Sequence, residues 1–499
     1  MYIISIDVGT TNTKVCLYQL PEFQLAEVVK FATPQVVKGT ETDLDAEQLW
    51  GNILKALQKL SDAVEDVQQI KQITVSSFGQ AVVLQDSEEK VIPPTIAWFD
   101  PRTKAEAQEA KEVIGEERLY EVAGINSHSN HSLTKLLWLK RHENTAFKRM
   151  HIWTCMSGFI ASRLTGVFAT DWSLASRTML FNITKKVWDN KFIETFELDI
   201  ETFPHVVESG ARIANIKESV SEKTGLPKNV TVSIAGHDHM AGSISTGLQK
   251  KTEILNSTGT TEGLLLIADK PNLSSGFRKF LISNGCYVME STYSIYGSMP
   301  TAGQSFSWIS KIFNKDITEI GRLCGEIYQK YTSDFRSMVE AIQVFIPHLR
   351  GSGPPIRSTS SKVMIYGLTD QSTDNDILFS MVAGLCFELK QLKGVYEQYL
   401  DSEINRIKVI GPAVKNPLWL QLKADILQAE IIAFEEEEAV AKGAAMLSAR
   451  KQGLVDTFQE AEVKTYTPKE ERVKILQDFY QNSYLPVYNL KNHLEGKDD

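Results

Sequence analysis

This chain of 499 residues has no closely spaced cysteine pair such as CxxC, no excess of basic charge and no long apolar run. The net charge of −9 gives no electrostatic support for nucleic acid or an anionic membrane as a partner. No apolar run approaches the roughly 20 residues of a membrane span, and no signal peptide precedes the first strand pattern. The cysteines lack metal-type spacing, so we expect reduced thiols in a cytoplasmic protein. They are Cys16, Cys155, Cys286, Cys324 and Cys386.

The length of the chain favours two domains of about 250 residues each. Hydrophobic residues make up 42% and charged residues 23%, which is ordinary for a globular protein. No low-complexity linker marks the division. We place the boundary near residues 247–252, which gives domains of residues 1–247 and 248–499.

The tripeptide Gly-Thr-Thr occurs twice, at residues 9–11 and 259–261, about half the chain apart. Each copy lies between two apolar runs, so we predict that each forms the turn of a β-hairpin. Glycine lets the backbone approach a ligand closely, and successive backbone N–H groups form a concave anion site. One such turn alone is usually only a turn. Two in equivalent settings predict a nucleotide polyphosphate held from both sides of a cleft.

Strands and helices alternate through most of the sequence, which favours the α/β class. Strand patterns cover residues 72–77 and 229–235, and helical patterns cover residues 49–64, 134–142, 377–399 and 439–450. Acidic residues at 435–438 precede the last helix, and we interpret them as the solvated start of that helix.

Asp7 ends the first strand pattern beside the first Gly-Thr-Thr turn. That position suits a carboxylate that holds Mg²⁺, usually through water, against nucleotide phosphates. The alternative is an aspartate that only caps the turn.

Asp238 follows a strand pattern and precedes small residues, a setting in which a carboxylate projects into a cleft at the mouth of a sheet. A kinase that acts on an alcohol needs such a carboxylate to accept the hydroxyl proton during transfer of the γ-phosphoryl group. The alternative is a structural aspartate of the turn. His237 and His239 beside it do not complete a metal-ligand set, so we interpret them as cleft wall or substrate contacts.

Several blocks of the sequence resemble those of the FGGY-type carbohydrate kinases, within the larger group that shares the actin/hexokinase ATPase fold. Residues 7–14 are similar to the first phosphate loop of that family, and residues 257–260 to the second. Residues 98–103 resemble its Trp-x-Asp-x-Arg-Thr motif beside the sugar site. Residues 235–238 fall where the family keeps Gly-Gly-x-Asp, whose aspartate is the catalytic base.

Two further blocks, at residues 135–139 and 170–178, extend the resemblance over nearly the whole chain. It implies two ribonuclease H-like domains, with mixed β-sheets flanked by helices and the active site in the interdomain cleft. It implies ATP and Mg²⁺ as cofactors, Asp238 as the base and Asp7 at the metal, and it leaves a homodimer open. The remaining residues expected at the nucleotide are Gly9, Thr10, Thr11, Asn12, Lys14, Gly259, Thr260, Thr261, Gln304, Gly411, Pro412, Ala413 and Asn416.

On the sugar side, the family blocks imply Asp45, Asp100 and Arg102, with His239 beside the base. Gln80 joins them because it lies in a turn at a strand end. A site that hydrogen-bonds several hydroxyls discriminates strongly against analogues that lack them. For Arg102, an ion pair with Asp100 or another acid is an equal alternative to direct sugar contact.

The chain also departs from the family pattern. Gly411-Pro412-Ala413 stands where three glycines often line the adenine pocket, so we expect altered adenine contacts. Phe78-Gly79-Gln80-Ala81 matches neither the Met-His of xylulokinases nor the Arg-Glu of glycerol kinases, and His239 differs from the glutamine of glycerol kinases. Glycerol is therefore disfavoured and the precise sugar stays open, with a xylulose- or gluconate-like substrate as the expectation from the family. The alternative is a non-catalytic sugar- or nucleotide-binding regulatory protein, which the joint presence of Asp7 and Asp238 disfavours.

Overall fold

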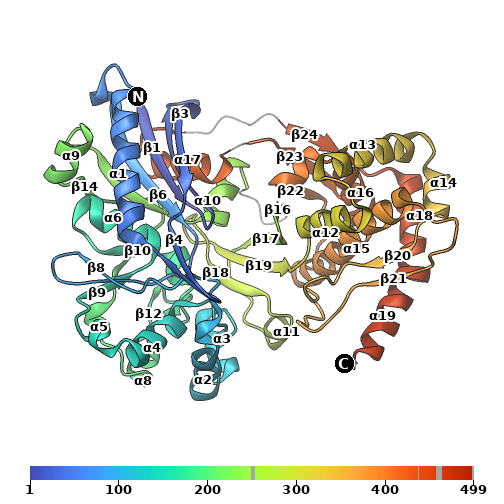
Figure 1. Cartoon of the computed structure of the whole chain (residues 1–499), viewed down its shortest axis with the longest axis horizontal. Helices are drawn as coiled ribbons and strands as arrows, with labels where there is room; N and C mark the ends of the chain where they lie inside the picture. The colour runs from blue at the N-terminus through green and yellow to red at the C-terminus, as the bar shows by residue number, and fades with distance from the viewer. Residues whose placement is uncertain (249–252, 437, 457–462, 497–499) are drawn as a thin grey trace.

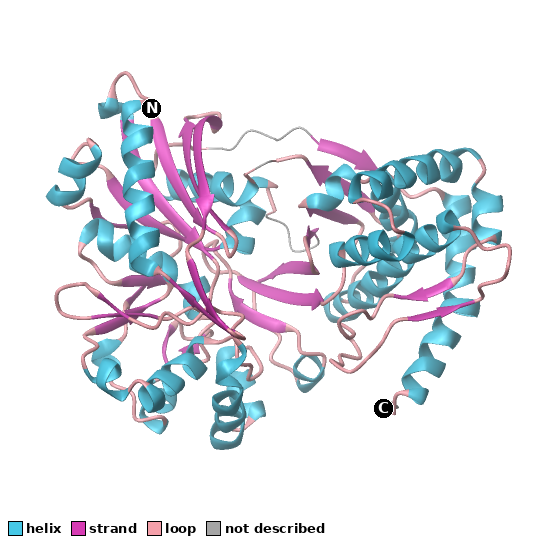
Figure 2. Ribbon diagram, viewed as in Figure 1, coloured by secondary structure: helices cyan, strands magenta, loops and turns pink. Residues whose placement is uncertain are grey.

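The structure, a computed structural model, describes residues 1–248, 253–436, 438–456 and 463–496. One large β-sheet lies in each half of the chain, and helices cover the sheets (Figures 1 and 2). The mixed α/β architecture with two sheet-containing domains confirms the predicted fold class.

The first sheet has six strands, and its order places the first hairpin beside two parallel strands. In spatial order these are β14 (Arg212–Asn215), β15 (Thr231–His237), β6 (Ile70–Ser77), β1 (Tyr2–Val8), β2 (Asn12–Gln19) and β3 (Gln24–Ala32). Strands β1, β6 and β15 run parallel, whereas β2, β3 and β14 are antiparallel to their neighbours.

The second sheet has seven strands and repeats this plan. In spatial order they are β18 (Ser283–Cys286), β19 (Tyr293–Met299), β17 (Glu262–Ala268), β16 (Glu253–Thr258), β22 (Arg406–Ile410), β23 (Glu430–Phe434) and β24 (Val463–Tyr466). Strands β16, β22 and β23 run parallel, and β17, β19 and β24 are antiparallel to their neighbours. The hairpins β1–β2 and β16–β17 therefore occupy equivalent places, which confirms both predicted hairpins.

Short two- and three-stranded sheets complete the strand set. They are formed by β4 (Gln35–Lys38) with β5 (Glu41–Leu44), by β8 (Val91–Ile92), β7 (Val83–Gln85) and β9 (Ile152–Thr154), by β10 (Ala169–Asp171) with β13 (His205–Val207), by β11 (Phe181–Asn182) with β12 (Val187–Trp188), and by β20 (Val344–Ile346) with β21 (Met364–Tyr366).

The helices of the first half are α1 (Ala46–Asp62), α2 (Lys104–Ile114), α3 (Glu116–Ala123), α4 (Ser132–His142), α5 (Asn144–Lys148), α6 (Met156–Thr165), α7 (Trp172–Ala175), α8 (Asn190–Thr195), α9 (Glu218–Thr224) and α10 (Asp238–Ser245). Those of the second half are α11 (Ser275–Lys279), α12 (Gly303–Phe313), α13 (Ile317–Ser333), α14 (Phe335–Glu340), α15 (Asp374–Leu400), α16 (Pro417–Leu427), α17 (Ala439–Lys451), α18 (Glu470–Phe479) and α19 (Leu485–Leu494). The four helical patterns predicted from the sequence correspond to α1, α4, α15 and α17.

Alternate residues of each central strand pack into different cores. In β1, Ile4 and Ile6 join the core beneath α1 and α6, whereas Ile3 joins a core that contains residues of α10 and α17. In β16, Leu255 faces that same shared core, and Ile254 faces the core of the second half. The two sheets thus meet across α10 and α17 in one apolar core.

Helix α17 belongs to the second half of the sequence, yet it packs on β1, β6 and β15 of the first sheet. Its small residues allow this, because a Cβ atom on Gly443 would lie only 2.0 Å from the carbonyl oxygen of Ala241 in α10. The predicted domain boundary falls largely on residues 249–252, which lie outside the described residues. Within the described ranges, no helix is both long and apolar enough to cross a bilayer.

Candidate active site

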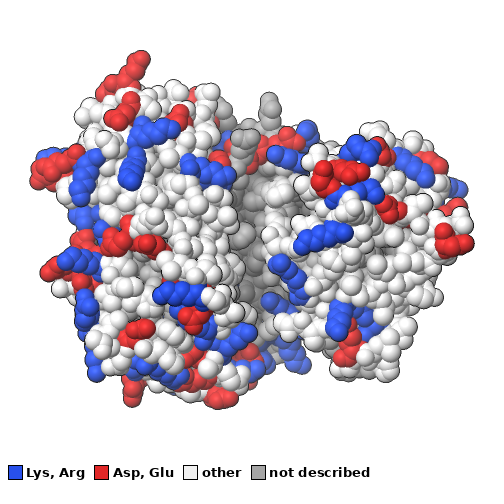
Figure 3. Space-filling model, viewed as in Figure 1, with Lys and Arg blue, Asp and Glu red and all other residues white. Residues whose placement is uncertain are grey.

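Figure 3 shows a groove between the two halves of the molecule. The predicted catalytic residues lie together at one edge of the first sheet. The parallel strands β1, β6 and β15 end side by side, with Val8 paired to Ser77 and Ser77 paired to His237. The carboxyl ends of all three strands therefore bring Asp7, Gln80 and Asp238 to the same edge, as in other α/β sites.

Asp7 is buried at this edge, with its Cα opposite that of Lys14 across the β1–β2 ladder. Its Oδ1 atom has no hydrogen-bond partner among the described residues. Burial is the main cause that raises the pKa of Asp7 to about 7. Repulsion from Asp238 and Glu438 adds to the rise, and attraction to Lys14 opposes it in part. A buried carboxylate with an unused oxygen is suited to a cation, because a positive charge relieves both penalties.

Asp238 is the first residue of α10, and it is held as a carboxylate. His237 Nδ1 lies 2.9 Å from Oδ1, and the backbone N–H of His239 donates to the same oxygen over 2.6 Å. Burial opposes the charge, but the two imidazoles and these contacts lower the pKa of Asp238 to about 2. The group is therefore ionised at neutral pH, which is the state that a proton acceptor requires.

A hydrogen-bond chain fixes the backbone just before Asp238. The N–H of His237 donates to Ser173 Oγ over 2.9 Å, and Ser173 Oγ donates to Asp171 Oδ2 over 2.5 Å. Gly236 has a φ of 109°, and a Cβ atom there would lie 2.5 Å from Ser173 Oγ. Only glycine fits this position, so the sharp approach of β15 to α10 is built into the sequence.

Gln80 lies in the turn after β6 with a φ of 73°, a left-handed conformation that glutamine rarely adopts. Its side chain is buried, and its backbone carbonyl oxygen accepts a hydrogen bond from Ser132 Oγ over 3.3 Å. A Cβ atom on the preceding Gly79 would contact His237 and Arg177. The turn therefore lies against the catalytic edge, and its strained backbone is typical of a functional loop.

Arg177 and Tyr296 form a further wall beside His239. The rings of His239 and Tyr296 lie 6.1 Å apart, and the charge of Arg177 acts on both groups. Arg177 Nε is buried without a hydrogen-bond partner among the described residues, and burial lowers the pKa of the guanidinium to about 10. Arg177 and Tyr296 therefore line the surroundings of His239.

Asp100 and Arg102 form an ion pair with each other. Arg102 donates to both carboxylate oxygens of Asp100 over 2.8 Å and reaches Asp43 over 2.9 Å. Asp100 also accepts from the backbone N–H of Thr42 over 2.5 Å. The structure contains the ion pair that was the alternative for Arg102, while sugar contact by Asp100 or Arg102 stays a prediction.

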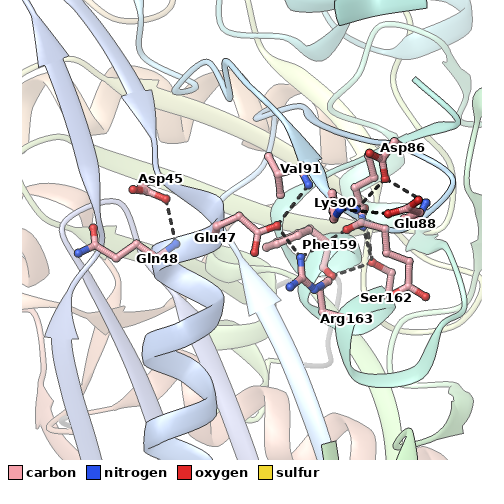
Figure 4. Close-up of polar contacts among 12 residues, drawn as sticks. Asp45, Glu47, Gln48, Asp86, Glu88, Lys90, Val91, Phe159, Ser162 and Arg163 are labelled. Atoms are coloured by element: carbon pink, nitrogen blue, oxygen red, sulfur yellow. Dashed lines mark hydrogen bonds and ion pairs between the residues drawn. The ribbon is translucent and has the colours of Figure 1, made fainter. Parts of the chain in front are cut away.

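Asp45 is the N-cap of α1, where its Oδ1 accepts from the N–H of Gln48 over 2.9 Å (Figure 4). In the same figure Glu47, one residue further on, lies instead with Arg163. The cap fully explains an aspartate at position 45. Its contact with a sugar remains a prediction.

The first phosphate loop is a tight turn that accepts hydrogen bonds from residues outside it. Gly9 N–H donates to the carbonyl oxygen of Asn12 over 3.1 Å, and Thr33 Oγ1 donates to the Gly9 carbonyl over 2.6 Å. Trp98 Nε1 donates to Thr10 Oγ1 over 2.9 Å. Thr11 is exposed at the tip. The loop is thus rigid, and its tip is free to face a ligand.

The second phosphate loop packs against the start of α12 and the loop after β22. Gly303 N–H donates to the Gly259 carbonyl over 3.0 Å, and Gln304 N–H to the Thr260 carbonyl over 3.3 Å. The structure therefore brings the predicted nucleotide residues of three separate segments into one place.

Gly411 and Ala413 lie against the end of β16. Gly411 has a φ of 93°, and a Cβ atom there would lie 2.0 Å from the Thr258 carbonyl oxygen. Ala413 N–H donates to Thr258 Oγ1 over 3.1 Å. Asn416 caps the following helix, because its side chain accepts from the N–H of Trp419 at the start of α16.

A wholly buried ion pair underlies this second loop. Lys423 of α16 contacts Glu262 Oε1 and Asn256 Oδ1, which flank the loop on β17 and β16, and its ammonium lies 4.6 Å from the ring centroid of Trp419. The pair fixes both sides of the hairpin. Sequence reasoning missed it, since a buried lysine at this spacing looks like any helical lysine.

Two further residues of the site were not predicted. Arg177 lies inside the block at residues 170–178, but the motif alone did not show that its side chain lies near His239. Glu438 was predicted to lie at a solvated helix start, and that prediction is wrong, because its side chain is only 15% exposed and pairs with Lys14. Only the packing of α17 on β1 brings it there.

The N-terminal domain of the FGGY family of carbohydrate kinases matches residues 2–245, and the C-terminal domain of that family matches residues 254–451. The chain belongs to this family. The kinase is 26% identical to a xylulose kinase of Bacillus subtilis (strain 168) over 512 residues, with 99% of each chain covered. It is 22% identical to a gluconokinase of Bacillus licheniformis over 520 residues, again with 99% of each covered.

The structure of the kinase is also similar to that of a ligand-bound xylulose kinase from Lactobacillus acidophilus, with a TM-score of 0.86 at 21% identity over 98% of each chain. This likeness confirms the fold. The family establishes the class of reaction, which is ATP-dependent phosphorylation of a carbohydrate. The alternative of a non-catalytic regulatory protein is accordingly set aside.

Proposed function

We propose that this kinase transfers the γ-phosphoryl group of ATP to a hydroxyl of a small sugar, sugar acid or polyol. Among these, a xylulose- or gluconate-like substrate is the one we favour. The observation that carries the proposal is the ionised Asp238 at the same sheet edge as Asp7 and next to the strained turn at Gln80. Relatives named for xylulose and for gluconate support these two substrate types, at 26% and 22% identity.

In the proposed mechanism, Asp238 accepts the proton of the reacting hydroxyl as the phosphoryl group transfers in line. Its contacts with His237 and His239 hold the carboxylate in place and keep it ionised. Closure of the groove over the sugar excludes water that would otherwise accept the phosphoryl group. Gln80 and His239 orient the sugar, and Asp45, Asp100 and Arg102 stay candidates for its more distant hydroxyls.

The nucleotide would lie between the two phosphate loops. Gly9, Thr10, Thr11, Asn12 and Lys14 would meet the phosphates from one side, and Gly259, Thr260 and Thr261 from the other. Gln304, Gly411, Pro412, Ala413 and Asn416 would line the base and ribose, since Gln304, Gly411 and Ala413 contact the second loop or the end of β16 before it.

Asp7 would hold Mg²⁺, because its Oδ1 is buried without a partner among the described residues and its charge is penalised in the absence of a cation. A bound Mg²⁺ would supply charge neutralisation between the phosphates. Asp7, Lys14 and the loop N–H groups would orient the phosphoryl group for attack.

The test is an ADP-release assay with purified enzyme and a panel of pentuloses, hexuloses, polyols and aldonates. We expect one pentulose or aldonate to exceed the others in kcat/KM by about 10²-fold or more, because unpaired polar groups in a hydroxyl-binding site discriminate strongly. Glycerol as the best substrate, or equal rates across the panel, would contradict the proposal.

Three lesser expectations accompany it. The domains would be residues 1–247 and 248–499, the protein would be cytoplasmic, and it could form a homodimer. The five cysteines, all buried and free, fit a reducing compartment. Limited proteolysis, cell fractionation and light scattering of the purified protein test these points in turn.

A further inference from the structure

Glu438 comes from the second half of the chain but lies at the first phosphate loop. It is the residue immediately before α17, which packs on β1 and β2 and, through Gly443, closely on α10. The hydroxyl of Tyr18, on β2, donates to the backbone carbonyl of Glu438 over 3.4 Å. The start of α17 is therefore fastened to the hairpin that carries the first loop.

The Glu438 side chain forms an ion pair with Lys14, and the two side chains are 15% and 24% exposed. The neighbouring acids behave differently, because Glu436 pairs with Lys442 and Glu435 with Lys464, both in the second half. Among the described members of this acidic run, Glu438 is the one paired across the two halves. Its contact is thus a feature of the site and not of a solvated helix start.

Charge makes this contact consequential. Asp238, Glu438 and Lys14 all affect the pKa of Asp7, and Asp7 and Glu438 affect the pKa of Lys14. These four groups therefore lie close together at the end of β1. Lysine carries its charge on a flexible stem, so its ammonium has a defined position only where a partner holds it. Lys14 lies opposite Asp7 in the ladder, which aims it at the same edge.

We propose that Glu438 is a positioning residue that acts through Lys14: it holds the ammonium where the nucleotide phosphates arrive and links the first phosphate loop to the second half of the chain. The inference rests on the proposed role of Lys14 at the phosphates. It assigns a function to an acidic residue outside both phosphate loops, and it makes the Lys14–Glu438 pair a contact between the two halves at the reacting group.

The experiment compares Glu438→Gln, Lys14→Met and the double variant with Glu436→Gln as the matched control from the same acidic run. Each variant is measured for kcat, for KM of ATP and of the sugar, and for binding of ADP and AMP by calorimetry. Thermal unfolding establishes that each variant is folded.

We expect Glu438→Gln to lower kcat/KM for ATP about tenfold or more, as for loss of a hydrogen bond between charged groups, with the sugar KM and AMP binding unchanged. Glu438→Asp, which keeps the charge, should recover part of the loss. Lys14→Met should be worse, because it leaves Glu438 as an unpaired carboxylate facing the phosphates. The double variant should therefore bind ADP more tightly than Lys14→Met alone. Glu436→Gln should match the wild type.

A purely structural Glu438 predicts the opposite pattern. Losses in ADP, AMP and sugar binding would then rise together, and the double variant would be worse than either single variant, which would overturn the inference. If Lys14→Met weakens ADP binding but Glu438→Gln changes nothing, the inference alone fails. If Lys14→Met changes nothing, the proposed placement of the phosphates fails, and the role of Glu438 falls with it.

Discussion

The indole of Trp98 donates its Nε1–H to Thr10 Oγ1 over 2.9 Å, and this bond joins the sugar-side loop to the first phosphate loop. Trp98 belongs to the motif at residues 98–103, and Thr10 is the central residue of the turn at residues 9–11. The side chain of Trp98 thus links the motif predicted to lie beside the sugar to the turn predicted to hold the phosphates.

Trp98→Phe tests this link, because phenylalanine keeps an aromatic ring and removes the donor. A net hydrogen bond contributes about 0.5–1.5 kcal/mol, so we expect kcat/KM to fall roughly 2- to 12-fold for ATP as well as for the sugar. Steady-state kinetics with each substrate varied in turn measure both. The neighbouring Phe99 is 42% exposed, and Phe99→Leu serves as the control with near-normal constants. A loss confined to the sugar would contradict the link.

Asp238→Asn should keep the fold and nucleotide binding but lose about 10²–10⁴-fold in kcat, because the amide cannot accept the hydroxyl proton. The side chain is similar in size, and the contact with the N–H of His239 can persist. Single-turnover measurements with saturating sugar separate the chemical step from product release. A variant with near-normal kcat would remove Asp238 from the role of base.

Asp7 should make stability fall with rising pH. Its folded-state pKa is about 7, whereas an unperturbed aspartate has a pKa of about 3.9. Between about pH 4 and pH 7 the folded chain therefore binds more protons at this group than the unfolded chain does, so the free energy of unfolding decreases as pH rises. Through Asp7 alone the loss is up to about 4 kcal/mol.

Urea unfolding of Asp7→Asn and wild type at pH 5 and pH 8 tests this expectation. The variant should gain on the wild type as pH rises, and Mg²⁺ at pH 8 should stabilise the wild type but not the variant. Asp316→Asn is the control, since Asp316 caps α13 and asparagine caps a helix equally well. A pH-independent difference between Asp7→Asn and wild type would show that the carboxylate is not penalised.

Gln80→Ala should lower kcat/KM for the sugar more than it changes the KM of ATP, because the amide is expected to pair with a sugar hydroxyl. Gln80→Gly removes the same amide and relieves the left-handed backbone, which has a φ of 73°. If the side chain makes the contact, both variants lose sugar affinity to a similar degree. Normal sugar kinetics in both would place Gln80 outside the sugar pocket.

The parts of the fold that were predictable depend on local chemistry. Gly-Thr-Thr between apolar runs forms a hairpin at both places where it occurs in this chain, and Asn416 before Pro417 forms a helix start. The packing partner of α17 was not predictable. A run of small residues shows that a helix packs closely against something, but the small residues do not show that the partner is the sheet of the other half.

The same distinction, between local sequence signals and tertiary packing, separates the site residues that could be predicted from those that could not. Asp7 and Asp238 follow strand patterns, and parallel strands must end at one edge, so their proximity could be predicted. Asp100 and Arg102 lie two residues apart, and nothing in that spacing decides between an ion pair and an open sugar site. Glu438 could not be predicted at all, because its contact with Lys14 joins residues 424 positions apart through tertiary packing.

The loop after β22 supplies the last prediction. Gly411 has a φ of 93°, and a Cβ atom there would lie 2.0 Å from the Thr258 carbonyl oxygen, so Gly411→Ala must move the loop away from the second phosphate loop. Backbone strain of this kind costs on the order of 1–3 kcal/mol, which corresponds to roughly a 5- to 150-fold rise in the KM of ATP if the loop lines the nucleotide. The sugar KM should stay unchanged, because the residues predicted to contact the sugar lie in the first half of the chain. Gly394→Ala in α15 is the matched control, since nothing lies within 4 Å of its Cβ position and alanine favours a helix. A Gly411→Ala variant with normal ATP kinetics would place the nucleotide elsewhere, and one with both KM values raised would indicate a global loss of structure.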